Sequence, residues 1–355
     1  MIVIGADTHK SSHTLVAVDQ VTGRQVGVRR VASTGAGAFA AVRWARGLPD
    51  PDRVWAIEDC RHVSGRLERL LISAGETVVR VPPRLMAGAR RSQRERGKSD
   101  PIDALAVARA AIREGVDRLP AARLDGAELD VRLLLDHHDD LVVMRSQCQQ
   151  RLRWHLHDLY DDLDVPAGGL DRAVWLDRVA RRLARGERTV RVGIARDLVG
   201  QIRTATRRIR ELEREISLLV DELCPQLVAE PGCGPLTAAK LVGEIAGLDR
   251  FPSDAKLARA AGVAPIPVSS GRRDRHRLDR GGNRQLNLAL HRFAVNRARR
   301  DPATAAYLAR KQAEGKTRME ALRCLKRHLA RRVWHLLHTP TTTTGSAPKP
   351  ALALT

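Results

Sequence analysis

Residues 2–31 read IVIGADTHKSSHTLVAVDQVTGRQVGVRRV and carry the clearest fold signal in the chain. The run IVIGAD is short and apolar, as is typical of a buried strand, and TLVAVD and QVGVRRV flank the turn VTGR as the two arms of a hairpin. The stretch therefore predicts three strands that can follow one another as a meander, which differs from a plain alternation of strands and helices.

The segments after this meander alternate between helix and strand patterns. Residues 36–47 and 63–74 predict helices, RVWAIED (53–59) and TVVRV (77–81) predict strands, and a further helix begins at Asp100. Three strands followed by helix-separated strands indicate a mixed sheet flanked by helices. We assign this α/β domain to residues 1–115.

Residues 116–225 predict a polar helical arm, so the fold class is α/β followed by all-α. Leu134, Leu141 and Cys148 are seven apart within a long helical pattern over 127–160. This helix and a second one can pack as an antiparallel pair across VPAGGL (165–170). The arm can equally associate with another copy of the chain, and the sequence pattern fits both arrangements. The second helix has a heptad seam of Leu198, Ile202, Ala205, Ile209, Leu212, Ile216, Leu219 and Leu223.

Residues 226–338 predict a third, helical block, and residues 339–355 a low-complexity, disordered tail. The block opens with a Pro/Gly-rich turn in EPGCGPLTAAKLVGEI (230–245), which indicates a helix-hairpin-helix. Glycines there let backbone N–H groups approach a DNA phosphate, although a tight turn without a ligand would look similar. Given the surrounding positive charge, we favour phosphate contact by Gly232, Gly234, Thr237 and Lys240.

The charge of the chain points to a polyanionic partner. A net charge of +21 and a pI near 11.1 attract phosphate backbones, although an arginine-rich composition also follows from a GC-rich genome. Only 3% of residues are aromatic, so base-stacking platforms are sparse and grooves that hold a duplex by its backbone are favoured. We infer that the leading partner is nucleic acid, with double-stranded DNA as the expected form.

Other residue patterns exclude several classes of protein. The five cysteines are widely spaced and form no CxxC pair, which argues against a disulfide framework or a structural zinc site. The N-terminus turns polar too early for a signal peptide, and no apolar run approaches the roughly 18 residues that span a bilayer. We expect a soluble, cytoplasmic protein.

Acidic residues of the first domain predict a metal site. Asp7 and Glu58 end two predicted strands, and Asp100 and Asp103 lie three apart at the start of a helix. Such placement can gather four carboxylates, and these cannot all remain ionised together without a cation such as Mg²⁺ or Mn²⁺. Asp100 and Asp103 can also act as a helix cap and as a partner of the helix dipole, and Asp59 competes with Glu58 for the site.

Six ordered motifs resemble those of the DEDD-type insertion-sequence transposases, whose members include bridge-RNA-guided recombinases. The resemblance runs from residue 3 to about residue 335. The motifs are GADTHK (5–10), AIEDCRHVSG (56–65), RERGKSDPIDALAVARA (94–110), PGCGPLTAAKLVGEIAGLDRF (231–251), AGVAPIPVSSG (261–271) and RGGNRQLN (280–287).

The resemblance implies an N-terminal ribonuclease-H-like domain, similar to Holliday-junction resolvases, and a C-terminal transposase domain with an essential serine. Carried over by position, its four metal-binding acidic residues are Asp7, Glu58, Asp100 and Asp103. Its serine, which becomes joined to DNA in the bridge-recombinase type, precedes a glycine and is therefore Ser270, with Ser269 as the weaker candidate. It also implies a linker that mediates oligomer formation as a dimer or tetramer, a guide RNA encoded by the element, and, in the cell, association with the nucleoid.

The chemistry of the serine segment suits this assignment. A serine hydroxyl needs charge stabilisation to attack a phosphodiester, and a metal ion or converging arginines supply it. The expected phosphate-binding residues of this segment are Arg272, Arg273, Arg275, Arg277, Arg280, Asn283 and Arg284.

Two rival hypotheses remain: a metal-dependent junction nuclease that uses water, and a non-catalytic DNA-binding protein.

Overall fold

The computed structural model describes residues 1–58, 61–82, 85–86, 99–119, 121, 126–247, 251–270, 273–277, 279 and 282–339. The chain divides into two compact units, one comprising residues 1–126 and 246–257 and the other residues 127–245 and 258–355. The predicted arm and the predicted third block therefore belong to one unit. The predicted disordered tail lies outside the described residues, apart from its first residue.

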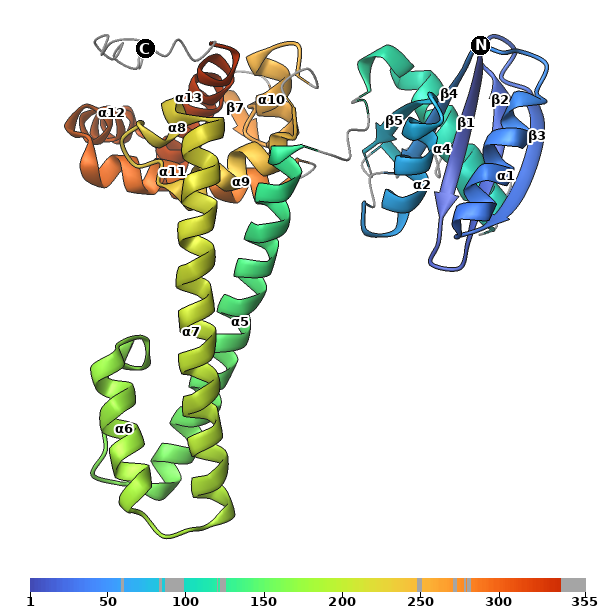
Figure 1. Ribbon diagram of the computed structural model, residues 1–355. Helices are drawn as coiled ribbons and strands as arrows, with labels where there is room; N and C mark the ends of the chain where they lie inside the picture. The colour runs from blue at the N-terminus through green and yellow to red at the C-terminus, as the bar shows by residue number, and fades with distance from the viewer. Residues whose placement is uncertain are drawn as a thin grey trace. The chain divides into compact units, whose positions relative to one another are not determined.

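The first unit is built on a five-stranded sheet in the order β3-β2-β1-β4-β5 (Figure 1). β1 pairs antiparallel with β2 and parallel with β4, while β2–β3 is antiparallel and β4–β5 is parallel. This confirms the predicted mixed sheet and its N-terminal meander. The strands are β1 (Ile2–Thr8), β2 (Ser12–Asp19), β3 (Gln25–Ala32), β4 (Arg53–Glu58) and β5 (Thr77–Val81).

Helices cover both faces of this sheet because the strand residues alternate between two apolar cores. Ile4, Trp55 and their same-face neighbours pack against helices α1 (Gly35–Arg46) and α2 (Arg61–Ser73). Val3, Val54 and the other face pack against α4 (Asp100–Glu114). Strands β1, β2, β4 and β5 are thus buried on both sides, which explains why they read as nearly continuous apolar runs, whereas the edge strand β3 is mostly exposed.

Gly5 decides how closely α4 approaches the sheet. A Cβ atom at Gly5 would lie 2.1 Å from the carbonyl oxygen of Ala104 and 2.6 Å from the backbone nitrogen of Ala108. Only glycine allows the backbone of α4 to cross β1 here, one turn after the helix begins. The crossing brings the first turn of α4 toward the end of β1.

Gly5→Ala is expected to destabilise the first unit by about 3 kcal/mol or more, because both neighbours in the clash are backbone atoms that cannot move aside. Hydrogen exchange of the β1 amides in urea measures the loss. Gly65→Ala is the matched control, since a Cβ on this helical glycine would meet nothing within 4 Å. That variant is expected to be neutral or stabilising by up to about 1 kcal/mol. Equal protection of β1 in both variants would contradict the assigned packing.

The second unit contains the arm, in which α5 (Ala127–Leu159) and α7 (Val190–Leu223) run antiparallel side by side (Figure 1). Arg191 forms an ion pair with Asp158, and the Cys148 thiol lies 3.3 Å from the amide oxygen of Gln201. Helix α6 (Ala173–Arg185) and the 3₁₀ turn η2 (Gly169–Asp171) pack beside them. Pairing within one chain is therefore realised, and association with a second copy stays a proposal.

The predicted seam of α7 is confirmed from Leu198 to Ile216, all of whose seam residues are buried. After Ile216 the buried position is Val220, whereas Leu219 and Leu223 are half-buried. In α5, Leu134 and Leu141 are half-buried as well, and Val131 and Leu135 are among the residues that face inward. A straight α-helix drifts away from an exact seven-residue repeat, so the buried stripe moves to neighbouring positions along the pair.

The third block is mostly helical, as predicted, but it also contains two strands that the sequence analysis did not predict. Residues 266–277 form a β-hairpin from β6 (Ile266–Ser270) and β7 (Arg273–Arg277). Arginines fill most of β7, so the hairpin lacks the alternating apolar pattern that signals a strand. The helices around it are α8 (Pro225–Val228), α9 (Pro235–Ile245), α10 (Asp254–Ala260), α11 (Arg284–Arg300), α12 (Pro302–Ala313) and α13 (Arg318–His338).

A buried ion-pair network fastens these helices together. Glu230, in the turn before α9, accepts hydrogen bonds from Arg297 of α11 at 2.6 Å and from Arg332 of α13 at 2.7 Å. Arg297 also donates to the Thr304 hydroxyl at the start of α12.

Among the described residues, none of the helices is long and apolar enough to cross a membrane.

Candidate functional site

The sheet register places Asp7 and Glu58 side by side. The last pair in the parallel register of β1 and β4 is Ala6 with Ile57, and Asp7 and Glu58 are each the next residue along their strand. Because side chains alternate along a strand, Asp7 lies on the face of Val3 and Glu58 on the face of Val54. This is the face that α4 covers.

Helix α4 brings the other two predicted carboxylates to this face. Its N-cap is Ser99, and Asp100 and Asp103 are both in its first turn. The alternative that the Asp100 side chain caps the helix is therefore not realised, because Asp100 is already helical. The crossing of α4 over Gly5 places this first turn toward Asp7, two residues further along β1.

A histidine that the sequence analysis missed lies between two of these carboxylates. His9 Nε2 is 3.0 Å from Asp7 Oδ2 and 3.6 Å from Asp100 Oδ1. One ligand atom from each of Asp7, His9 and Asp100 lies within 4.8 Å of the others. His9 stands two residues after Asp7 in GADTHK, and this spacing at a strand end is the signal that was available.

Burial and the neighbouring carboxylates both disfavour the ionised form of Asp7. Burial raises the pKa of its carboxyl above the ordinary value, the His9 ring opposes that shift, and the charges of Asp103 and Asp100 raise the pKa further. Asp103 thus acts on Asp7 together with Asp100. Arg30 Nη2 is 3.8 Å from Asp100 Oδ2 at the exposed side of the cluster. A set of carboxylate oxygens with one imidazole fits a divalent cation.

The predicted serine lies in the hairpin of the second unit. Ser270 is the last residue of β6 and pairs with Arg273, while Ser269 pairs with Asp274. The backbone is described at these positions, and their side chains, like that of Arg275, lie outside the described residues, as do Gly271, Arg272 and Arg280. Arg277 at the end of β7 and Arg284 at the start of α11 are exposed.

Close backbone contacts fasten the base of this hairpin. A Cβ atom at Gly282 would lie 2.2 Å from the backbone nitrogen of Gly262. Asn287 donates from Nδ2 to the carbonyl oxygen of Ala261 at 2.8 Å, and its own Oδ1 accepts from Lys326 Nζ at 2.8 Å. Asn287, which the sequence analysis did not single out, therefore ties the chain just before the hairpin to α11 and, through Lys326, to α13.

Asn283 has both ends of its amide engaged within the protein. Its Oδ1 accepts from the backbone N–H groups of Gln285 and Leu286, which makes it the N-cap of α11. Its Nδ2 donates to Glu244 Oε2 at 2.7 Å. These bonds connect the start of α11 to α9.

Of the four residues predicted to contact phosphate before and within α9, some remain partly exposed and others contact the rest of the protein. Gly234 has open space where a Cβ atom would lie, while its carbonyl oxygen accepts from the N–H groups of Thr237 and Ala238, and Thr237 is half-buried. Gly232, with φ of 89°, packs against Arg297, whose backbone nitrogen lies 2.4 Å from the Cβ position. Lys240 is only 8% exposed and lies 3.1 Å from Asp139 and 3.5 Å from Asp136 of α5. It therefore holds α9 onto α5.

Two family models match the chain. A model described as "Transposase IS116/IS110/IS902 family" matches residues 224–309, and a DEDD-type model described as "Transposase" matches residues 4–161. The first covers the helical block with the serine hairpin. The second covers the sheet domain with the acidic cluster.

Curated relatives are insertion-element proteins of actinobacteria. The chain is 28% identical over 392 residues to the "Insertion element IS116 uncharacterized 44.8 kDa protein" of Streptomyces clavuligerus, covering 98% of this chain and 97% of the relative. It is 26% identical over 398 residues to the "Insertion element IS900 uncharacterized 42 kDa protein" of Mycobacterium paratuberculosis, covering 97% and 98%. A solved complex of Thermus thermophilus RuvC with a Holliday junction substrate matches with a TM-score of 0.27 and 16% identity, covering 34% of this chain and 99% of that chain.

Proposed function

Since the chain matches two transposase family models and is similar over nearly its whole length to insertion-element proteins, we propose that it is a transposase of the IS116/IS110/IS902 family that cuts and rejoins DNA through a covalent serine–DNA intermediate. The observation that carries the proposal is the acidic cluster at the carboxyl end of β1, which brings together carboxylates far apart in the sequence. The serine comes from the family resemblance and from its place in a hairpin rich in arginine. The strand order of the first unit supports the ribonuclease-H-like assignment.

The proposed metal site consists of Asp7, Glu58, Asp100 and Asp103, with His9 beside them. Mg²⁺ or Mn²⁺ would supply the positive charge that the developing negative charge on the phosphate requires. Asp7 and Asp100 hold the carboxylate oxygens near one another, and the packing of α4 on β1 keeps that spacing. His9 donates to Asp7 and so orients that carboxylate.

The proposed chemistry uses the Ser270 hydroxyl as the nucleophile. Its oxygen forms a bond to phosphorus as the bond to the leaving sugar oxygen breaks, and the hydroxyl proton passes to water or to that oxygen. The phosphoserine ester conserves the bond energy, so a free DNA hydroxyl can attack it and release the serine without a high-energy cofactor. Arginines of the same segment hold the phosphate oxygens.

The proposed partners follow from the family. Donor and target double-stranded DNA are the substrates, an RNA encoded by the element guides their choice, and a dimer or tetramer holds the two duplexes. In that assembly the acidic cluster of one copy meets the serine of another. Within the cell, we propose that the protein works in the cytoplasm at the nucleoid.

The described contacts refine the proposed DNA-binding residues. We propose that Gly232, Lys240 and Asn283 position neighbouring elements, because their contacts lie within the protein. The residues that we propose to contact phosphate are Gly234, Thr237, Arg272, Arg273, Arg275, Arg277, Arg280 and Arg284.

A metal-removal experiment tests this function against a junction-type nuclease, which the acidic cluster alone would also suit. Purified protein is incubated with element-end DNA and element RNA, with Mg²⁺ or with EDTA, and then denatured. A protein–DNA adduct is expected with Mg²⁺ and not with EDTA. Cleavage without an adduct would indicate the nuclease, and binding without cleavage under any metal would indicate a non-catalytic DNA-binding protein.

A further inference from the structure

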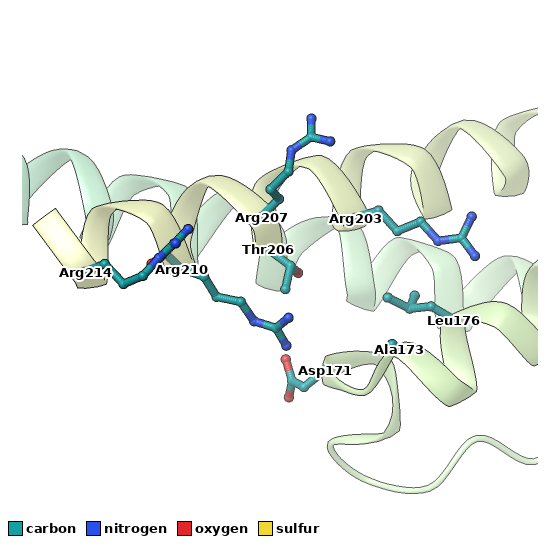
Figure 2. Close-up of a pocket in the computed structure, with 8 residues that line it drawn as sticks. All are labelled: Asp171, Ala173, Leu176, Arg203, Thr206, Arg207, Arg210 and Arg214. Atoms are coloured by element: carbon teal, nitrogen blue, oxygen red, sulfur yellow. The ribbon is translucent and has the colours of Figure 1, made fainter.

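The arm carries a pocket of about 240 Å³ that the proposed function does not use (Figure 2). One wall is helix α7, and the other is formed by η2 and the first turns of α6. Four arginines line the α7 side and one carboxylate lies opposite. The arginines, which we call the arginine row, are Arg203, Arg207, Arg210 and Arg214, and the carboxylate is that of Asp171.

The arginine row is a continuous feature of one helix face. Its members are separated by four, three and four residues, the spacing that keeps side chains on the same side of a helix. With a rise of about 1.5 Å per residue, the row extends along about 16 Å of α7. Figure 2 shows Arg210 extending toward Asp171 and Arg207 extending away from it, so the positive charge is spread along the helix rather than focused on one point.

Among the described residues, most of this charge is not paired with a carboxylate. Arg203 forms an ion pair with Asp177. Arg207, Arg210 and Arg214 have no ion pair with any carboxylate of the described residues. The Asp171 carboxylate is itself shared, because Gln149 donates to it at 2.9 Å and Arg145 lies 3.5 Å away. Like charges at this spacing repel one another, so an anion would stabilise the row.

A buried hydroxyl in the same pocket also lacks a partner. Thr206 Oγ1 is buried and has no hydrogen-bond partner in the part of the chain that the structure describes, although a helical threonine can ordinarily donate to the carbonyl four residues earlier. Buried polar atoms without a partner are rare in proteins. An anionic oxygen in the pocket would accept from this hydroxyl and from the neighbouring guanidinium groups at once.

We propose that the arginine row binds the phosphodiester backbone of a nucleic acid along the arm. An extended row fits a polymer of phosphates better than a single small anion, and guanidinium groups bind phosphate oxygens in pairs. The proposal rests on the proposed function in taking a nucleic acid as partner. It adds a second contact region, distant in the chain from the serine hairpin, that holds the nucleic acid without reading its sequence.

Equilibrium binding of the full chain to duplex DNA and to element RNA tests the proposal in EDTA, so that no cleavage is needed. The test variant is Arg207→Gln with Arg210→Gln, and the control is Arg191→Gln with Arg208→Gln. Both remove two charges from α7, but Arg191 and Arg208 are paired with Asp158 and Glu211 outside the row. Glutamine and arginine have similar helix propensities, so the arm is expected to fold in both.

The test variant is expected to bind at least one of the two nucleic acids about tenfold more weakly at about 0.1 M salt. The slope of log affinity against log salt concentration becomes shallower by about 1.8 for a duplex, since each phosphate contact contributes about 0.9. The control keeps the slope of the unmodified chain. Comparison of the affinities for duplex DNA and for RNA identifies which backbone binds to the arginine row.

Two results would overturn the proposal. One is a test variant that binds both nucleic acids with unchanged affinity and salt slope. The other is a change of oligomeric mass by light scattering with unchanged nucleic-acid binding, which would assign the row to an acidic surface of a second copy. The adduct assay distinguishes failure of this proposal from failure of the proposed function. An unmodified chain that binds nucleic acid through the arginine row but forms no adduct contradicts only the serine chemistry.

Discussion

Ser270→Ala is expected to abolish the denaturation-resistant protein–DNA adduct while leaving DNA binding intact. The alanine lacks the oxygen that forms the bond to phosphorus, and water cannot replace it in a covalent intermediate. Denaturing electrophoresis of labelled element-end DNA measures the adduct. The backbone of the hairpin is expected to keep its register, because its base is held by Gly262, Gly282 and Asn287 rather than by the serine.

Ser269→Ala is the matched control for this experiment. The two serines are neighbours in β6, and they pair with different residues of β7, Ser270 with Arg273 and Ser269 with Asp274. The control is expected to form the adduct at a rate close to that of the unmodified chain. An adduct that disappears in Ser269→Ala and persists in Ser270→Ala would reverse the assignment of the nucleophile.

Asp7→Asn is expected to slow strand cleavage by at least about 10²-fold, since a lost metal ligand removes several kcal/mol of charge stabilisation. Of the four predicted carboxylates, Asp7 is the one that the described distances place against both His9 and Asp100. Isothermal titration with Mn²⁺ is expected to show weakened metal binding, which gives a readout independent of cleavage. Asp52→Asn, an exposed carboxylate at the opposite end of the parallel strands, is the control and is expected to cleave normally.

Stability distinguishes a lost ligand from a misfolded domain in this variant. Burial and the neighbouring carboxylates raise the pKa of Asp7, so its ionised form is less stable in the metal-free folded state than in the unfolded chain. Removing the charge is therefore expected to leave the metal-free melting temperature unchanged or higher. A lower melting temperature together with lost cleavage would instead assign Asp7 a role in folding.

Most of the first unit could be predicted from local patterns. The strands IVIGAD, TLVAVD and RVWAIE are apolar runs ended by polar residues, and the structure has strands at each of them. The predicted helix from Asp100 begins at that residue. These elements follow from spacing and composition alone, because a strand buried on both faces needs apolar residues at nearly every position.

The missed features have a common physical cause. The β6–β7 hairpin carries arginines where a strand usually has apolar residues, and its stability comes from contacts at its base with residues such as Asn287. Lys240 reads as a surface cation in sequence, yet Asp136 and Asp139 of a helix about 100 positions earlier pair with it. Neither contact leaves a pattern in the local sequence.

The sequence by itself determined most helices and strands of the first unit and that Asp7 and Glu58 each end a strand, because burial sets the spacing of apolar residues within each segment separately. Only the tertiary structure decided that His9 lies between Asp7 and Asp100 and that α5 pairs with α7 of the same chain. The physical reason lies in packing between distant segments. Gly5 permits α4 to cross β1 at a distance that any side chain would prevent, and that crossing, not the spacing of the carboxylates, assembles the site.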